Sequence, residues 1–161
     1  SEEGLMPRRA DITPRVLEAD PVHSSTLVTQ FINAVMLDGK RSTAERLVYD
    51  ALAIVAEKTG KPPVEALESA VKTVTPVLEV RSRRVGGAAY QVPMQVNKNR
   101  QQSLAIRWIL GACREKKGRP MYLKLSDELL AAYNREGTAY TKRENVHRMA
   151  DANKAFAHYR W

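Results

Sequence analysis

Three arginines, Arg81, Arg83 and Arg84, lie within four consecutive positions of a stretch rich in β-branched residues. Side chains alternate between the two faces of a strand, so Arg81 and Arg83 are expected to share one face. A guanidinium group can donate two parallel hydrogen bonds to phosphate oxygens, so this pattern favours contact with phosphate groups. The alternative interpretation is a solvated, charged strand edge that prevents aggregation.

Cations and aromatic rings occur together at two further places. Arg107 is followed by Trp108, which its spacing from Leu104 and Ala112 predicts to be a core residue. A C-terminal group mixes basic, polar and ring side chains: Lys142, Arg143, His147, Arg148, Asn153, Lys154, Phe156, His158, Tyr159, Arg160 and Trp161. Such residues suit RNA, because rings and guanidinium planes stack on bases. The alternative is that these rings pack back onto the domain.

The remaining reactive residue types form no recognisable catalytic site. The histidines His23, His147 and His158 stand apart, with spacing that is poor for metal ligation. The single cysteine, Cys113, excludes an internal disulfide, favours a reducing compartment and lies on a predicted helix face. Gly86 lies in a segment without the spacing and following lysine of a nucleotide-binding loop. We therefore expect no enzymatic activity, metal, cofactor or small-molecule substrate.

The positive charge is concentrated in one quarter of the chain. The net charge is +8 and the pI is about 9.8, which indicates a polyanionic partner and favours nucleic acid over a membrane. Residues 79–119 hold 10 basic and 2 acidic side chains, whereas residues 1–78 hold 9 and 11. No apolar run approaches the roughly 18 residues of a membrane-spanning helix, so no membrane partner is expected.

The elements that position these side chains fit into one domain, for which 161 residues are enough. Residues 1–22 are polar and proline-containing, which indicates an extended arm. Residues 23–161 predict a mainly α domain of about six helices with one protruding basic β-hairpin at about 77–96. An isolated hairpin is only marginally stable in water, so a partner is expected to hold it.

Capping and stop residues predict the helix boundaries. The predicted starts are Ser24 or Ser25, Ser42 with Glu45, Pro62 with Pro63, Asn99 with Gln102, Pro120, and Thr141 with Glu144. The predicted ends are Asp38 with Gly39, Gly60, Pro76, Gly118 and Gly137, and the last helix carries the apolar residues Val146, Met149 and Ala150.

Several strings carry a family resemblance that spacing alone does not provide. They are MPRR at 6–9, DPV at 20–22, LDGKRS at 37–42, TPVLEVRSRRVGGAAYQVP at 75–93, LAIRW at 104–108 and HRMADANKAFAHYRW at 147–161. In this order they closely resemble the bacterial-type family of small-subunit ribosomal protein seven. The resemblance implies a helical domain with a protruding hairpin that binds the 3′ major domain of small-subunit rRNA and nucleates assembly of the head.

The resemblance also implies roles for individual residues. The expected rRNA-binding residues are Arg8, Arg9, Lys40, Arg41, Arg81, Arg83, Arg84, Arg107, Lys142, Arg143 and Arg148. The residues expected near exit-site tRNA and mRNA are Val85, Gly86, Gly87, Ala88, Ala89 and Tyr90. The expected neighbours are the small-subunit ribosomal proteins nine, eleven and thirteen.

The sequence departs from the family pattern in two places. Residues 1–5 precede the Met-Pro-Arg-Arg with which bacterial members usually begin, and residues 98–125 resemble organellar members more closely. The expected location is therefore the mitochondrial matrix, with a plastid or the bacterial cytoplasm as alternatives.

Two rival functions belong to other classes of protein. The first is a free regulatory protein that binds RNA or DNA through the ribbon, and the second is an RNA-processing enzyme. Small tip residues from Gly86 to Ala89 disfavour the first, because they cannot intercalate. The missing acid–base or metal cluster disfavours the second.

Overall fold

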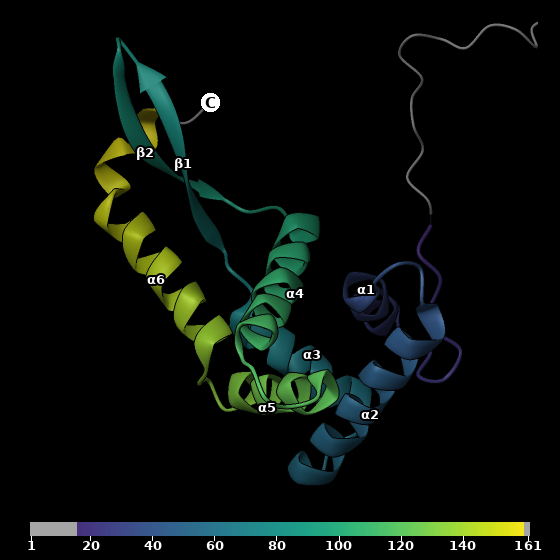
Figure 1. Cartoon of the computed structure of the whole chain (residues 1–161). Helices are drawn as coiled ribbons and strands as arrows, with labels where there is room; N and C mark the ends of the chain where they lie inside the picture. Colours follow the sequence, from purple (N-terminus) through teal and green to yellow (C-terminus); the bar gives the residue numbers. More distant parts are fainter. Residues whose placement is uncertain (1–15, 160–161) are drawn as a thin grey trace, which may run out of the picture.

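The computed structural model describes residues 16–159, and this range confirms the mainly α domain with one hairpin (Figure 1). Six α-helices are present in the described range, as expected. In chain order the elements are α1 (Thr26–Val35), α2 (Arg41–Thr59), α3 (Pro63–Val74), β1 (Leu78–Val85), β2 (Ala88–Gln95), α4 (Lys98–Glu115), α5 (Met121–Tyr133), α6 (Thr138–Ala152) and the 3₁₀ helix η2 (Lys154–Tyr159).

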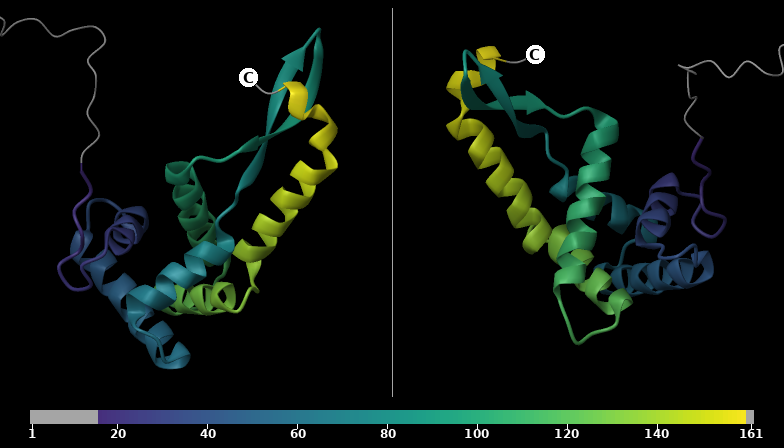
Figure 2. Two further views of the ribbon diagram at one scale, coloured as in Figure 1. Left: turned by 180° about the vertical axis from the view of Figure 1, so that it is seen from behind. Right: turned by 45° about the horizontal axis from the view of Figure 1, so that its top comes forward.

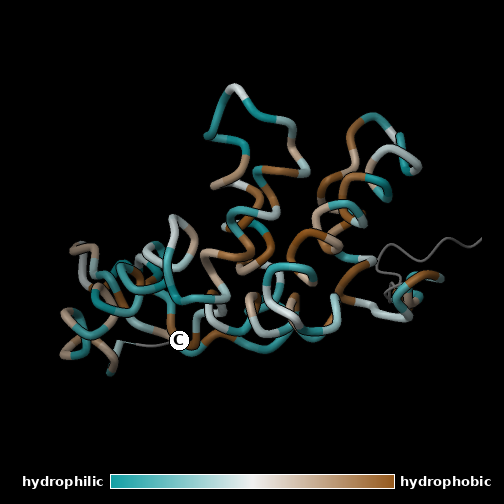
Figure 3. The backbone as a smooth tube through the Cα atoms, turned by 90° about the horizontal axis from the view of Figure 1, so that it is seen from below, coloured by the Kyte–Doolittle hydropathy of each residue, from teal (hydrophilic) through white to brown (hydrophobic). Residues whose placement is uncertain are grey.

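The hydrophobic core lies where the first five helices meet. Its largest fully buried apolar side chains are Phe31, Ile32, Leu52, Leu67, Ile109, Leu110, Leu125 and Leu129. In Figure 3, hydrophobic and hydrophilic colours alternate along the helical tubes, as they do when one helix face is buried. Burial of each such side chain contributes about 1.5–3 kcal/mol, so this shared core holds α4 and its basic residues in a fixed position.

The hairpin projects beyond the helical core and is supported by the C-terminal part of the chain (Figures 1 and 2). β1 and β2 pair antiparallel from Leu78 with Gln95 to Val85 with Ala88. Gly86 and Gly87 form the two-residue turn with φ of +58° and +86°, values that glycine adopts without steric cost. α6 and η2 pack along the ribbon. The hairpin is thus supported by contacts with α6 and η2 of the same chain.

Helix starts agree with the sequence patterns at some positions and differ at others. Ser25 caps α1 as predicted, because its Oγ accepts a hydrogen bond from the Val28 N–H at 3.3 Å. The predicted capping box of Ser42 with Glu45 is wrong. Ser42 lies inside α2, and the Glu45 carboxylate instead accepts a hydrogen bond from Arg41 at 3.1 Å. A neighbouring cation competes here for the carboxylate that the capping box needs.

The predicted starts of α4 and α6 are also displaced. Asn97, rather than Asn99, caps α4, and its Oδ1 accepts a hydrogen bond from the Arg100 N–H at 3.0 Å. α6 begins at Thr138 and has no side-chain cap from its own flanking residue, so Thr141 lies within the helix. Instead, the buried Glu128 of α5 accepts a hydrogen bond from the Ala139 N–H at 2.9 Å. A residue from another helix therefore replaces the predicted local cap.

The helix ends follow the stop residues approximately. Gly60 ends α2 in the left-handed conformation, with φ of +69°. α4 ends at Glu115 and α5 at Tyr133, which are both earlier than the glycines predicted to end them. In α6, Ala150 is buried, Val146 is half-buried and Met149 is 53% exposed.

The described end of the N-terminal arm is tied to the core by Asp20. Its buried carboxylate accepts hydrogen bonds from the N–H groups of Val22, His23 and Ser25, and from the Tyr49 hydroxyl at 3.1 Å. Burial alone raises the pKa of Asp20, but these donors outweigh it and hold the pKa below its ordinary value. The charged carboxylate therefore fixes the entry into α1.

Candidate nucleic-acid interface

The three arginines of β1 have different surroundings. Arg81 donates a hydrogen bond to Glu79 at 2.6 Å, and Arg83 donates one to the Tyr159 backbone carbonyl. Arg84 is exposed, and in residues 16–159 its side chain makes no hydrogen bond or ion pair. Arg84 is therefore the member of this group whose guanidinium is most available to a phosphate group.

Glu79 connects the hairpin to α4. One of its carboxylate oxygens accepts from Arg81 and the other accepts from Arg100 at 2.9 Å. Burial alone raises the pKa of Glu79, but the hydrogen bonds and charges of Arg100 and Arg81 outweigh it and lower the pKa. The ionised carboxylate thus holds two guanidinium groups side by side at the base of the ribbon.

The basic surface continues along one face of α4. Arg100, Arg107 and Arg114 are spaced seven residues apart, which corresponds to almost two helical turns and places them on the same face. With Arg81, these residues form what we term the basic row. Of the row, only Arg81 and Arg107 are among the binding residues expected from the sequence. The seven-residue spacing was the available signal for Arg100 and Arg114.

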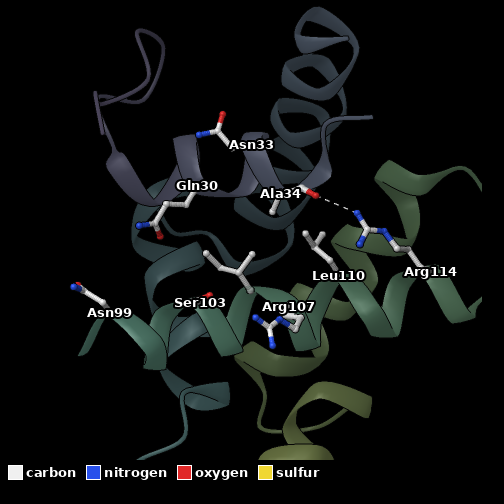
Figure 4. A pocket seen from close by; sticks show the side chains of 9 residues that line it. Gln30, Asn33, Ala34, Asn99, Ser103, Arg107, Leu110 and Arg114 are labelled. Atoms are coloured by element: carbon white, nitrogen blue, oxygen red, sulfur yellow. Dashed lines mark hydrogen bonds between the residues drawn. The ribbon is translucent and has the colours of Figure 1, made fainter. Parts of the chain in front are cut away.

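A groove of about 550 Å³ lies between this face of α4 and α1 (Figure 4). Arg107 and Arg114 lie on its α4 side, and Arg114 donates a hydrogen bond to the Ala34 carbonyl of α1 at 3.1 Å. On the α1 side, Gln30 Oε1 is buried and has no hydrogen-bond partner in the described residues. The groove thus offers cations and an unsatisfied acceptor, a combination that can bind a polar anionic chain.

The start of α2 reaches the same groove. Lys40 and Arg41 are exposed, and Arg41 donates a hydrogen bond to Oδ1 of Asn33, which lines the groove, at 2.9 Å. The structure thereby brings Arg41 close to the basic row, as a common binding surface requires. The expected binding residues Arg8 and Arg9 lie outside the described residues.

The cationic residues of α6 have a separate arrangement. Lys142 Nζ lies 5.7 Å from the ring centre of Trp108, which is half-buried against the core, as predicted. Arg143 donates a hydrogen bond to the Thr75 carbonyl at 3.3 Å, and Arg148 is exposed. Among the described residues, no hydrogen bond or ion pair joins these three cations to the basic row.

The aromatic residues of the C-terminal segment pack against the hairpin. Tyr90 of β2 lies 5.2 Å from Phe156 and 4.7 Å from Tyr159, measured between ring centres. This packing supports the alternative in which the tail folds back onto the domain. It also places Tyr90 in an intramolecular cluster, although the resemblance implied a position beside tRNA and mRNA. The turn residues Gly86 and Gly87 are exposed at the end of the ribbon.

Cys113 and His147, which are of residue types that can take part in catalysis, have structural roles in this fold. Cys113 is fully buried, and burial raises the pKa of its thiol to about 12, which makes it unreactive at neutral pH. His147 Nε2 accepts a hydrogen bond from the Val77 N–H at 3.0 Å. Residues 16–159 contain no group of three or more histidine, cysteine or acidic residues that could hold a metal ion. In the same range, no helix is long and apolar enough to cross a membrane.

Comparison with known proteins extends over almost the whole chain. Residues 7–154 match the family model described as ribosomal protein S7p/S5e. A protein named small ribosomal subunit protein uS7 from Rhodopirellula baltica is 63% identical over 147 residues, covering 90% of this chain and 94% of the relative. The protein of the same name from Dictyoglomus turgidum is 58% identical over 156 residues, covering 97% of this chain and 100% of the relative.

Proposed function

Because the chain belongs to the ribosomal protein S7p/S5e family, we propose that it is a structural constituent of the small ribosomal subunit. In this role it binds the 3′ major domain of the small-subunit rRNA and nucleates assembly of the head. The observation that carries the proposal is the basic row, which runs from the hairpin along α4 and borders the groove beside α1. Affinity for nucleic acid comes largely from cations that neutralise phosphate groups, and this surface supplies them.

The proposed contact set combines the expected residues with those of the row. The rRNA-binding residues that we propose are Arg8, Arg9, Lys40, Arg41, Arg81, Arg83, Arg84, Arg100, Arg107, Arg114, Lys142, Arg143 and Arg148. Arg83 holds the C-terminal segment through the Tyr159 carbonyl, so we propose that its contribution to RNA binding is partly indirect. The division into an arm at 1–22 and a binding domain at 23–161 is part of the same proposal.

We further propose that the hairpin turn lies near exit-site tRNA and mRNA. The turn segment Val85–Ala89 carries no charge, so it contributes little to the electrostatic attraction of RNA. Glycine has no Cβ, which permits close approach of another molecule to the backbone at Gly86 and Gly87. The proposed protein neighbours are the small-subunit ribosomal proteins nine, eleven and thirteen.

Salt dependence of rRNA binding tests the proposal. Arg84→Ala combined with Arg107→Ala removes two exposed guanidinium groups that have no side-chain partner among the described residues. Each lost phosphate contact is expected to reduce the slope of log affinity against log salt by about 0.7–0.9. The measurement is affinity for the isolated head-domain rRNA fragment across a salt series.

A matched control removes the same charge far from the row. Lys58→Ala combined with Lys61→Ala changes exposed residues at the end of α2, away from the hairpin (Figure 1). The control is expected to retain the wild-type slope. Equal effects of the two double variants would contradict a localised interface and indicate a general response to net charge.

The location that we propose is less specific than the one expected from the sequence. The relatives named above come from bacteria and lend no support to a mitochondrial ribosome. We propose a bacterial-type small subunit, and the mitochondrial matrix stays a prediction from residues 98–125. We propose that the protein has no enzymatic activity. Co-sedimentation with small subunits at moderate salt distinguishes a ribosomal constituent from a free regulatory protein and from a processing enzyme.

A further inference from the structure

A second cationic site combines Arg143 with two cations, Lys72 and Arg135, that are not among the binding residues expected from the sequence. A pocket of about 370 Å³ is formed where α3 meets the turn between α5 and α6. Its ionic lining residues, Lys72, Arg135 and Arg143, are all cations, and hydroxyl groups complete the lining: Ser69, Thr73 and Tyr140. The pocket therefore combines positive charge with the hydroxyl groups of Ser69 and Tyr140, which suits an oxyanion.

Most of this positive charge has no compensating partner. Lys72 and Arg135 are exposed, and within residues 16–159 neither side chain makes a hydrogen bond or ion pair. Arg143 is oriented by the Thr75 carbonyl and by the Glu144 carboxylate, which lies 2.6 Å away. Glu144 thus offsets one of three cations, and the pocket keeps a net positive charge.

The wall of the pocket is fixed before any ligand binds. The Thr73 hydroxyl of α3 lies within hydrogen-bond distance of two carbonyl oxygens, those of Ala70 at 2.8 Å and of Ala132 in α5 at 2.6 Å. The contact with Ala132 holds α3 against the end of α5. An anion that enters the pocket therefore meets Lys72 of α3 and Arg135 of the turn after α5, and the relative position of these two helices is already set.

Arg135 occupies a backbone position that normally favours glycine. Its φ is +59°, and it follows the end of α5 with the hydrogen-bond pattern of a Schellman motif. The Arg135 N–H donates to the Ala132 carbonyl at 3.0 Å, and the Glu136 N–H donates to the Ala131 carbonyl at 2.8 Å. The comparable end of α2 carries Gly60. The left-handed backbone conformation is costly for arginine, so we expect the Arg135 side chain to have a functional role.

We propose that this pocket binds a backbone phosphate of the RNA, so that Lys72, Arg135 and Arg143 form a separate anchoring point of the interface. The inference rests on the proposed function, because it takes the same rRNA as its ligand. Arg143 is already among the expected contact residues and provides continuity with the rest of the binding surface. Three cations surround the pocket, and a phosphodiester, unlike a neutral base, offers charged oxygens to each of them.

The decisive variant is Arg135→Gly. Glycine adopts the left-handed conformation without steric cost, so this variant is expected to unfold at the same or a higher temperature than the wild type. Loss of one phosphate contact should lower the salt slope of binding to the head-domain rRNA fragment by about 0.7–0.9. The affinity difference from wild type should then grow about fivefold to eightfold for each tenfold dilution of salt.

Three further variants separate charge from structure. Arg135→Lys keeps the cation and is expected to bind nearly as the wild type does. Lys72→Ala should reduce the slope as Arg135→Gly does, whereas Lys61→Ala, which removes a remote exposed lysine, should leave it unchanged. If Arg135→Gly and Lys72→Ala both retain the wild-type slope, the phosphate site is wrong.

The outcomes also distinguish this inference from the proposed function. Wild-type slopes for Arg135→Gly and Lys72→Ala, together with a reduced slope for Arg84→Ala with Arg107→Ala, would contradict phosphate binding in the pocket. The same result would agree with the proposed function. Failure of the wild-type protein to bind the fragment would overturn both. If Arg135→Gly binds the fragment normally but weakens incorporation of a neighbouring protein during reconstitution of the subunit, the pocket holds a protein carboxylate and the inference is wrong.

Discussion

At the scale of single residues, carboxylates organise this basic protein. Glu79 holds Arg81 and Arg100 together, Glu128 caps α6, and Asp20 fixes the entry into α1. Each of these side chains is buried or nearly buried, and each accepts hydrogen bonds from at least two donors or cations. A buried charge is stable only when it is paired in this way, so these few acids are expected to matter more than the exposed ones.

Asp20 provides a test at this scale. Asp20→Ala is expected to destabilise the protein by about 2–3 kcal/mol at pH 7, because buried N–H groups lose their acceptor. The lowered pKa of Asp20 means that its contribution is present above the ordinary value of 3.8 and is lost as pH falls through the folded-state pKa. Urea unfolding at pH 7 and pH 3 should therefore show a smaller difference between variant and wild type at pH 3.

The control for this measurement is Asp50→Ala. Asp50 is exposed on α2, and its carboxylate accepts no hydrogen bond from the described residues. This variant should change the free energy of unfolding by less than about 0.5 kcal/mol at either pH. If Asp20→Ala has as small an effect at pH 7, the carboxylate does not anchor the arm.

At the scale of elements, the junction between α5 and α6 is determined by close packing. Gly137 precedes α6 with φ of +94°, and a Cβ added there would lie 2.9 Å from the Ala131 Cβ and 3.1 Å from Glu128 Oε1. The small residue thereby lets the Glu128 carboxylate reach the Ala139 N–H. The direction in which α6 leaves the core, and hence the support of the hairpin, depends on this junction.

Gly137→Ala is therefore expected to destabilise the protein by about 2–4 kcal/mol, through backbone strain and steric overlap. Gly111→Ala is the matched control. Gly111 lies within α4, and a Cβ added there would meet no atom within 4 Å outside the backbone of its own helix. Alanine at this position should therefore stabilise the helix by about 0.5–1 kcal/mol. Thermal unfolding of both variants measures the contrast, and similar melting temperatures would show that the junction tolerates a side chain.

At the scale of the whole molecule, the proposed RNA-binding surface and the hairpin turn lie in different parts of the structure. The helical core carries the groove and most of the basic row, and Arg81 of the row lies at the base of the ribbon. The ribbon extends beyond the core with an uncharged turn at its end (Figures 1 and 2). The C-terminal rings of Phe156 and Tyr159 pack against Tyr90 and hold the ribbon in place. A ribbon held in this way can present its turn at a fixed distance from the attached surface.

Shortening the ribbon tests this separation. Deletion of Arg84, Val85, Ala88 and Ala89 removes two cross-strand pairs, so the Gly86–Gly87 turn again closes on a hydrogen-bonded pair, Arg83 with Tyr90. The ribbon becomes shorter by about 6.8 Å. Affinity for the head-domain rRNA fragment should match that of Arg84→Ala, which loses the same charge, while ribosomes reconstituted with the deletion variant frameshift more often or retain exit-site tRNA less well than those with Arg84→Ala. Lower rRNA affinity than Arg84→Ala, together with normal decoding, would contradict the division of roles.

The sequence by itself determined the features that depend on nearby residues. Apolar spacing, Pro63, Gly60 and the Gly86–Gly87 turn predicted the helices and the hairpin correctly, because helix formation and tight turns are governed by local geometry. The concentration of positive charge in residues 79–119 likewise predicted a polyanionic partner. The resemblance to the ribosomal protein family followed from strings spread along the chain.

Only the tertiary structure decided how distant residues pair. Glu45 accepts a hydrogen bond from Arg41 and does not complete a capping box, and Glu128 caps the helix for which Thr141 was the predicted cap. Tyr90 packs against C-terminal rings that lie far from it in the sequence. In each case a side chain had several possible partners of similar strength. The choice among them depends on which partners packing brings within hydrogen-bond or ring-contact distance, and packing is a property of the whole folded chain.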